Sequence, residues 1–342
     1  MHFGHANAFR QGRALGTKLV VGVNSSSSIA EAKGGAPVMD DAERAAMVRA
    51  CKFVDAVVED VPYVMDEAYV RGLLERRGVD LVVHGDDPCI VDGRDVYEAA
   101  KSLGRYRSIP RTEGVSTTDL VGRMLLLAKR SAPAQGEPVL LSKTVEDDAR
   151  LLKKSRAFLS TSRMTRNFAR GARAPAAGAT VVYACGAFDL FHAGHAAFLE
   201  EARRLGDYLL VGVHGDSVVS RRRGDGFPVM NLQERVLSVL ACRHVDDVLV
   251  DAPWAVSEAM LASFNIQVVV RGAGGPAATD ADDPFRVPRA RGLFKLVTSS
   301  SSLNSAKIAD RIQARRGQLL ARYHDKAQKE ADYYRDKDAK TA

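Results

Sequence analysis

Two pairs of histidines, each in a His-x-Gly-His arrangement, are the residues of this chain best suited to chemistry. The first pair is His2 and His5 around Gly4, and the second is His192 and His195, 190 residues later. Each pair stands where a helix is expected to begin, so its imidazoles lie beside free N–H groups, and the glycine lets a phosphate approach the backbone. Donors placed there can stabilise charge that develops on phosphate oxygens. Helix capping is the alternative role, but the in-register duplication favours a phosphate-handling site.

The histidine motif belongs to a repeat that runs through both halves of the chain. A Pro-Val-Met sequence followed by Glu-Arg occurs at 37–44 and again at 228–235. Residues 50–55 likewise correspond to residues 241–246. A period of about 190 residues is far longer than a solenoid repeat. The sequence therefore predicts two homologous domains.

Apolar periodicity predicts alternating helices and strands. In the first copy we expect helices at 6–15, 42–52, 66–77 and 118–129 and strands at 18–23, 56–58 and 81–83. Strands separated by such helices form a parallel sheet covered on both faces. The expected fold is α/β, with two tandem Rossmann-like domains joined by a linker. We place domain 1 at 1–130, a linker with a helix between 145 and 170 at 131–178, domain 2 at 179–312 and a charged tail at 313–342.

The two copies differ at opposite ends. An apolar run from Val181 leads through Gly186, Ala187 and Phe188 into the second histidine pair, whereas the first pair follows Met1 directly. A parallel sheet without this strand exposes ladder groups, so we expect the translated protein to begin upstream of Met1 with an equivalent strand. Near the other end, the Arg-Thr-Glu-Gly-Val-Ser-Thr-Thr segment at 111–118 has only the serine-rich segment 299–305 as its counterpart.

Composition narrows the class of protein. With 46% hydrophobic and 27% charged residues the 342-residue chain is typical of a globular protein. The net charge of +7 is spread over the run Arg221 to Arg223, the linker and the tail, without the interleaved aromatic residues of single-strand binders. We therefore expect no nucleic-acid partner and favour small phosphorylated anions. No apolar stretch is long enough to cross a bilayer, so we expect no integral membrane segment and a cytoplasmic location. A homodimer is a possible assembly.

The four cysteines predict neither a zinc site nor a disulfide framework. Cys51, Cys89, Cys185 and Cys242 contain no Cys-x-x-Cys pair. Cys51 and Cys242 occupy equivalent positions of the repeat on apolar segments. We expect both to be buried, reduced thiols.

Residues 186–195, Gly-Ala-Phe-Asp-Leu-Phe-His-Ala-Gly-His, and residues 111–118 resemble the two signature motifs of the cytidylyltransferase family. The tandem arrangement is similar to the members that act on phosphoethanolamine. Members that act on phosphocholine have one catalytic domain and a long membrane-binding helix, which this chain lacks. The resemblance implies transfer of CMP from CTP to phosphoethanolamine, which gives CDP-ethanolamine and pyrophosphate, in phosphatidylethanolamine synthesis.

The resemblance also assigns roles to individual residues. It implies that the catalytic residues are His2, His5, Lys33 and Arg111. It implies nucleotide binding by Gly4, Thr112, Ser116, Thr117 and Thr118, and in the second copy by Gly186, Ala187, Phe188, His192 and His195. The amino-alcohol substrate would be bound by Lys52, Tyr63, His84, Asp86 and Asp87. A phosphomonoester is already an anionic nucleophile, so positioning and charge stabilisation matter more than a general base. Mg²⁺ on the pyrophosphate oxygens is the expected cofactor, without a readable ligand set.

The second copy departs from the family pattern. Arg223 stands in place of Lys33, Arg271 in place of His84, and Trp254 in place of Tyr63. We therefore expect domain 2 to be a degenerate partner with a structural or regulatory role. The alternatives are an inactive or regulatory relative or fragment, and an enzyme for another phospho-alcohol such as phosphocholine. A dinucleotide-dependent dehydrogenase requires Gly-x-Gly-x-x-Gly after the first strand, where this chain has Gly-Ala-Phe-Asp.

Overall fold

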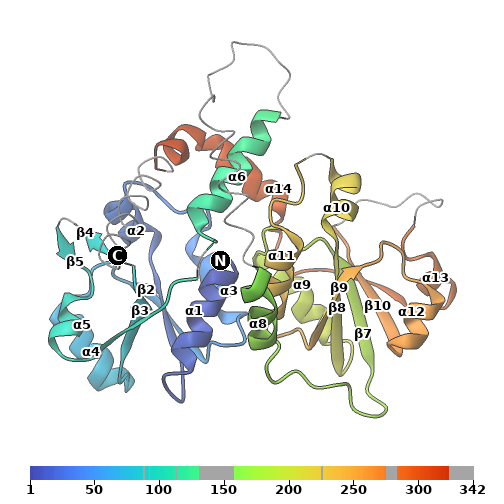
Figure 1. Cartoon of the computed structure of the whole chain (residues 1–342), viewed down its shortest axis with the longest axis horizontal. Coiled ribbons are helices and arrows are strands. Elements are labelled where there is room, and N and C mark those ends of the chain that lie inside the picture. Colours follow the sequence, from blue (N-terminus) through green and yellow to red (C-terminus); the bar gives the residue numbers. More distant parts are fainter. Residues whose placement is uncertain are drawn as a thin grey trace.

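Two α/β units lie side by side in the computed structural model (Figure 1), which describes residues 1–322 apart from 88, 92, 113, 131–157, 225 and 275–282. Domain 1 contains the blue to green elements as far as α6, and domain 2 the yellow-green to red ones. The predicted α/β class with parallel sheets is confirmed in both units.

Domain 2 is built on a five-stranded parallel sheet. Its strands are β7 (Val181–Gly186), β8 (Tyr208–His214), β9 (Asp247–Ala252), β10 (Ile266–Gly272) and β11 (Phe294–Val297), in the order β11-β10-β7-β8-β9. Its helices are α9 (Ala193–Arg203), α10 (Asp216–Arg223), α11 (Leu232–Leu240), α12 (Glu258–Ser263), α13 (Arg286–Ala290) and α14 (Ser305–Ala314). The central strands β7 and β8 are continuous apolar runs because helices cover both faces of a parallel sheet.

Domain 1 has a similar succession of strands and helices, but its strands form separate two-stranded sheets. Its strands are β1 (Val20–Asn24), β2 (Ala56–Val61), β3 (Val82–Gly85), β4 (Ile90–Val91), β5 (Arg94–Asp95) and β6 (Tyr106–Ile109). Its helices are α1 (Phe3–Arg13), α2 (Ser26–Lys33), α3 (Asp41–Arg49), α4 (Glu67–Arg77), α5 (Glu98–Ser102) and α6 (Thr117–Arg130). The parallel pairs are β1 with β2 and β3 with β6, and within the described ranges no strand joins them as β7 joins β8 to β10.

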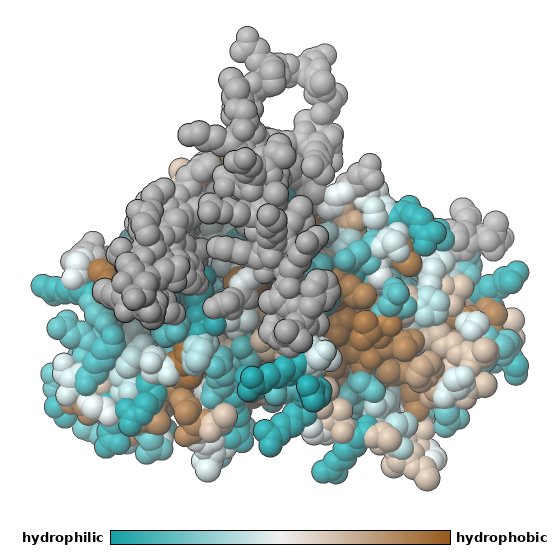
Figure 2. All heavy atoms as spheres, viewed as in Figure 1, coloured by the Kyte–Doolittle hydropathy of each residue, from teal (hydrophilic) through white to brown (hydrophobic). Residues whose placement is uncertain are grey.

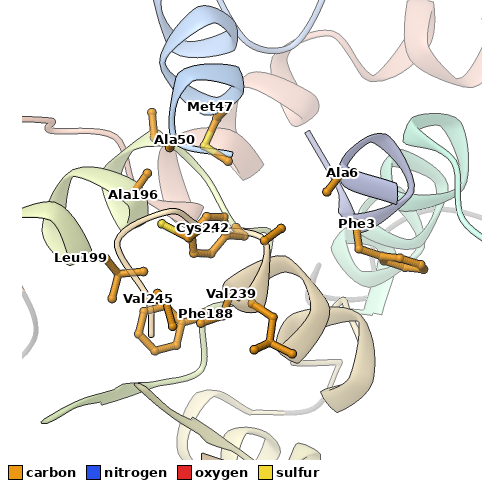
Figure 3. Close-up of a cluster of buried hydrophobic side chains, with 14 of the residues drawn as sticks. Phe3, Ala6, Met47, Ala50, Phe188, Ala196, Leu199, Val239, Cys242 and Val245 are labelled. Carbon is orange, nitrogen blue, oxygen red and sulfur yellow. The ribbon is translucent and has the colours of Figure 1, made fainter. Parts of the chain in front are cut away.

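One hydrophobic core extends across both domains. Phe3 and Met47 of domain 1 belong to the same buried cluster as Leu199, Val239 and other residues of domain 2. Figure 3 shows how side chains from α1, α3, α9 and α11 meet in this cluster. The helix contacts are reciprocal, since α1 packs on α11 while α9 packs on α3. Each histidine-bearing helix therefore lies against the other domain.

The two repeat-related cysteines lie at the centre of this interface. Cys51 and Cys242 form an isolated antiparallel bridge. It is closed by backbone hydrogen bonds from Lys52 to Ala241 (2.9 Å) and from Arg243 to Ala50 (2.8 Å). Both are buried free thiols, as predicted, and burial raises the pKa of Cys51 to about 11.

The linker and the tail contribute more to packing than the sequence indicated. Helix α8 (Phe158–Phe168) lies inside the range expected for a linker helix, and its Phe168 is fully buried edge-on to Phe53, with ring centroids 5.5 Å apart. In the segment predicted to be a charged tail, Leu319 is buried and Arg315 donates to Pro37 O (3.0 Å) of domain 1. The predicted linker residues 131–157 and tail residues 323–342 lie outside the described ranges.

The surface in Figure 2 is largely hydrophilic on the side of domain 1, and hydrophobic side chains gather over domain 2 in the region of β8 and β9. Among the helices that the structure describes, none has the length and apolar character needed to cross a membrane.

Candidate active site

The first histidine pair forms the start of α1. His2 is the N-cap residue, and its backbone N–H donates to Nδ1 of His5 at 3.3 Å. The two imidazole rings lie 4.0 Å apart; His2 is buried and His5 is exposed. A Cβ atom on Gly4 would come within 2.8 Å of Cγ1 of Val115. Glycine is therefore needed at this position, because the segment 111–118 packs directly on the histidine turn.

The segment 111–118 brings a second helix N-terminus to the same place. Thr112 Oγ1 accepts a hydrogen bond from the side-chain amide of Asn7 in α1 (2.8 Å). Ser116 Oγ accepts from the backbone N–H of Asp119 (3.0 Å), and α6 begins at Thr117. The first N–H groups of a helix carry partial positive charge and bind anions. Thr117 and Thr118 thus lie where a phosphate chain would be held.

The carboxyl end of β3 supplies the acidic residues of the site. Asp86 Oδ1 accepts a hydrogen bond from the backbone N–H of Arg111 (3.0 Å), and Asp87 lies 3.8 Å from Nη1 of the same arginine. His84, on β3 itself, lies with its Nδ1 3.2 Å from Gly85 O. The predicted residues His84, Asp86, Asp87 and Arg111 are therefore brought together.

Lys33 reaches this group from α2. It is the last residue of that helix, which ends because Gly34 adopts a left-handed conformation with φ of 67°. Its Nζ lies 5.1 Å from the centroid of the Tyr63 ring. Burial lowers the pKa of His84, and the positive charge of Lys33 lowers it further. One face of the site is thus formed by Lys33, Tyr63 and His84. The lysine contributes a cationic donor, the tyrosine an aromatic ring and the histidine an imidazole.

A pocket of about 390 Å³ opens beside His84, and sequence reasoning missed most of its lining. The His84 ring lies 4.5 Å from Tyr97, which in turn lies 5.6 Å from Tyr106. The lining consists mainly of acidic and aromatic residues: Gly85, Asp86, Asp87, Cys89, Asp95, Tyr97, Lys101, Tyr106 and Ser108. Its one lysine is paired with Asp95. The pocket has an excess of negative charge, which suits a small cation.

Lys52 lies elsewhere, contrary to its predicted place in the substrate pocket. Its backbone bonds across the domain interface, and its Nζ lies 5.6 Å from the Phe53 ring centroid. Burial at this interface lowers the pKa of Lys52. The sequence predicted Lys52 as the last residue of a helix at 42–52, whereas α3 ends at Arg49 and Lys52 lies in the loop that forms the domain interface.

The Gly-Ala-Phe-Asp turn of domain 2 is held by backbone interactions. Phe188 has a positive φ of 50°, a strained conformation for a bulky residue. The buried carboxylate of Asp189 accepts from the backbone N–H groups of Val229 (2.8 Å) and Met230 (2.9 Å). Ala187 O accepts from Arg235 (2.6 Å). Gly186 ends β7 directly before this turn.

The second histidine pair is packed among aromatic and backbone groups of domain 2. The rings of His192 and His195 stack at 3.8 Å, and Phe188 and Phe191 lie 5.4 and 5.6 Å from His195. A Cβ on Gly194 would lie 2.0 Å from Leu303 O. Burial lowers the pKa of His192 to about 4 and that of His195 well below its usual value. Both imidazoles are therefore neutral at neutral pH.

This burial makes stability depend on pH. The unfolded His192 has a pKa near 6.5 and the folded one about 4, so the unfolded chain binds more protons in between. We expect this residue to stabilise the fold fully above pH 6.5 and to lose about 3 kcal/mol by pH 4. Chemical denaturation at several pH values measures the slope. The His192→Gln variant should show a shallower slope, and an unchanged slope contradicts the assignment.

Domain 2 keeps a cation stacked on an aromatic ring, but from a shifted position. The Arg222 guanidinium lies 4.3 Å from the Trp254 ring centroid, as Lys33 lies over Tyr63. The sequence repeat had aligned Arg223 with Lys33. Trp254 also contacts His214, whose ring centroid lies 5.4 Å from its own.

Comparisons with known proteins agree with this arrangement. A family model described as cytidylyltransferase-like matches residues 1–123 and 183–302. The ethanolamine-phosphate cytidylyltransferase of Arabidopsis thaliana is 44% identical over 98% of this chain and 83% of its own length. The enzyme of the same name from Dictyostelium discoideum is 45% identical over 97% of this chain and 93% of its own length. The choline-phosphate cytidylyltransferase A of Rattus norvegicus is 36% identical over 38% of this chain and 36% of its own length.

Proposed function

The chain belongs to the cytidylyltransferase-like family, within the tandem-domain ethanolamine-phosphate cytidylyltransferases, and we propose that its domain 1 transfers CMP from CTP to phosphoethanolamine. The products are CDP-ethanolamine and pyrophosphate, and the product supplies phosphatidylethanolamine synthesis. Both substrates are water-soluble, so we propose that the reaction takes place in the cytoplasm.

The observation that carries this proposal is the juxtaposition of phosphate-binding groups and an acidic aromatic pocket in domain 1. Arg111 joins the two regions, because it precedes the α6 N-terminus and contacts Asp86 and Asp87 at the pocket. Phosphoethanolamine carries a phosphate and an ammonium group separated by two carbons. A molecule of this kind can place its phosphate towards the α6 side and its ammonium in the pocket.

In the proposed reaction, a phosphate oxygen of phosphoethanolamine attacks the α-phosphorus of CTP. The bond from that phosphorus to the oxygen bridging the β-phosphate breaks, and pyrophosphate leaves with the electron pair. No proton must be removed from the nucleophile, so the protein positions two anions and stabilises the developing charge. We assign His2 and His5 as donors to the reacting phosphates, and Lys33 and Arg111 as the cations that neutralise them.

The ammonium group fits the pocket chemistry. Asp86 and Asp87 offer carboxylate oxygens, and Tyr97 and Tyr106 line the pocket with aromatic, hydroxyl-bearing side chains. Aromatic faces attract cations, and an –NH₃⁺ group can also donate three hydrogen bonds. A trimethylammonium group has no N–H to donate, which favours ethanolamine over choline.

Mg²⁺ is proposed to enter with the nucleotide. The described residues include no group of three or more His, Cys, Asp or Glu side chains placed to hold a metal ion. Mg²⁺ is commonly bound through substrate phosphates with one or two protein carboxylates. We therefore assign no residue of the chain as its ligand and derive no step from it.

Steady-state pyrophosphate release with CTP and either phospho-alcohol tests the substrate assignment. We expect kcat/KM for phosphoethanolamine to exceed that for phosphocholine by at least about 100-fold, because the pocket's acceptors lose their partners with the trimethylated substrate. A Tyr97→Ala variant should raise KM for phosphoethanolamine more than KM for CTP. Equal or better turnover of phosphocholine contradicts the assignment, and absence of turnover with both favours a regulatory relative.

A further inference from the structure

Helix α6 carries the start of the domain 1 nucleotide site but packs against domain 2. Its first residues, Thr117 and Thr118, lie at the predicted triphosphate position. Among the described elements, the one that α6 contacts most is α14 of domain 2. Figure 1 shows the two helices crossing above the junction of the domains. Buried Val121, Met124 and Leu125 of α6 belong to the same cluster as Ile308 and Ile312 of α14.

A salt bridge fixes α6 to the other domain. Arg123 donates from Nη1 to Glu234 Oε2 at 2.8 Å and from Nη2 to Glu234 Oε1 at 3.1 Å. The same guanidinium donates to Val229 O at 3.3 Å. The Glu234 side chain is only 7% exposed and that of Arg123 27% exposed. A bidentate pair with this little solvent access holds its partners in one geometry.

The position of Arg123 in the middle of α6 lets this contact orient the start of the helix. It follows Thr117 by six residues, which corresponds to about 9 Å along an α-helix. A helical segment of this length behaves as a rigid rod, so fixing its middle also fixes the direction of its N-terminus. Glu234 is itself well fixed, because its carboxylate also accepts from the backbone N–H of Asn231 (2.9 Å) in the capping box of α11.

The repeat provides an equivalent contact from domain 2 to domain 1. Arg311 of α14 donates from Nη1 to Glu43 Oε2 (2.6 Å) and from Nη2 to Glu43 Oε1 (2.8 Å), and it also bonds Val38 O (3.3 Å). Glu43 caps α3 as Glu234 caps α11, by accepting from Asp40 N at 3.0 Å. The two contacts have the same chemistry, but Glu43 fixes the helix beside the enclosed histidines of domain 2.

We propose that Glu234, a residue of domain 2, is a positioning residue for the nucleotide site of domain 1, because its bidentate contact with Arg123 sets the place of the α6 N-terminus. The inference rests on the proposed function, since it concerns the binding of CTP for that reaction. Glu234 acts through Arg123 and touches neither substrate. Domain 2 thereby contributes to catalysis without a reaction of its own.

Glu234→Gln and its repeat counterpart Glu43→Gln form a matched pair of variants. Glutamine keeps the size of each side chain and one oxygen for the helix cap, but it removes the charge and replaces the second acceptor oxygen with an NH₂ group, so the bidentate contact with arginine is lost. We expect Glu234→Gln to raise KM for CTP by about 5- to 30-fold, in the range of coupling between distant sites. KM for phosphoethanolamine should stay unchanged. Both variants should lower the melting temperature by similar amounts, because the two lost contacts have the same chemistry, but Glu43→Gln should leave KM for CTP unchanged.

A double-mutant cycle distinguishes positioning from loss of stability. Arg123→Gln should raise KM for CTP at least as much as Glu234→Gln, because it also removes the hydrogen bond from Arg123 to Asp119 (2.7 Å), and the double variant should raise it no further than Arg123→Gln alone. CTP-induced stabilisation against heat, measured on each folded variant, gives the same ranking without turnover. Equal KM increases in Glu234→Gln and Glu43→Gln, or none in Glu234→Gln, overturn the inference. A wild-type chain without cytidylyl transfer instead overturns the proposed function.

Discussion

Replacement of His5 by alanine is expected to lower kcat for CDP-ethanolamine formation by about 100- to 1000-fold, the usual effect of losing one donor aimed at developing charge. His5 is exposed at the start of α1 and lies 4.0 Å from His2, next to the segment that leads into α6. Steady-state pyrophosphate release on the purified variant measures the loss.

The matched control for this experiment is His195→Ala. His195 is stacked on His192 and flanked by Phe188 and Phe191. Its domain has serines where domain 1 has the Arg111 to Thr118 segment. We expect this variant to lose stability and only a small part of kcat. If folded His195→Ala, checked by circular dichroism, is as inactive as His5→Ala, then domain 2 takes part in the chemistry and the assignment of the reaction to domain 1 is wrong.

Removal of the Lys33 ammonium is expected to reduce kcat/KM by about 100-fold, because this group supplies positive charge beside the phosphates and cannot be replaced by water. Lys33 lies over the Tyr63 ring at the pocket edge. Burial lowers the pKa of His84, and the positive charge of Lys33 adds to this effect. Measurement with both substrates varied separately shows whether kcat or KM carries the loss.

Arg222→Ala is the control for Lys33→Ala, since it removes the corresponding cation from the Trp254 ring in domain 2. The reaction is assigned to domain 1, so this variant should keep its activity. A comparable loss of kcat/KM in Arg222→Ala shows that the effect of Lys33→Ala comes from general loss of positive charge rather than from the site.

The repeat made the fold predictable. Motifs written twice established two domains, and apolar periodicity placed α3, α4, β2 and β3 to within a few residues. The serine-rich helix α2 and the short strand β6 were not predicted. Residues 26–33 contain three serines and no buried residue, so no apolar face marks α2. The strand β6 has two exposed residues among four, and its identity depends on pairing with β3.

The site was predictable where residues belong to a motif and less so where the fold brings them together. His2, His5, Arg111 and the residues up to Thr118 follow from motifs. Tyr97 and Tyr106 lie before and after the short helix α5, and only packing against His84 brings them to the pocket.

The domain interface was the part that the sequence did not reveal. Glu43 and Glu234 were visible as repeated residues, but their partners Arg311 and Arg123 are 268 and 111 residues away along the chain. Lys52 was misplaced for the same reason, because the loop that carries it pairs with Ala241 in the other domain. Contacts of this separation depend on how whole domains dock, which local patterns do not encode.

The fate of CTP labelled on its α-phosphate tests the central claim most directly. When labelled CTP is incubated with the chain and phosphoethanolamine, the label is expected in CDP-ethanolamine, with unlabelled pyrophosphate released in equal amount. His5→Ala should slow this transfer by about 100- to 1000-fold. Label that stays in CTP or appears as free CMP contradicts the account, because the juxtaposed phosphate and ammonium sites of domain 1 would then not carry out cytidylyl transfer.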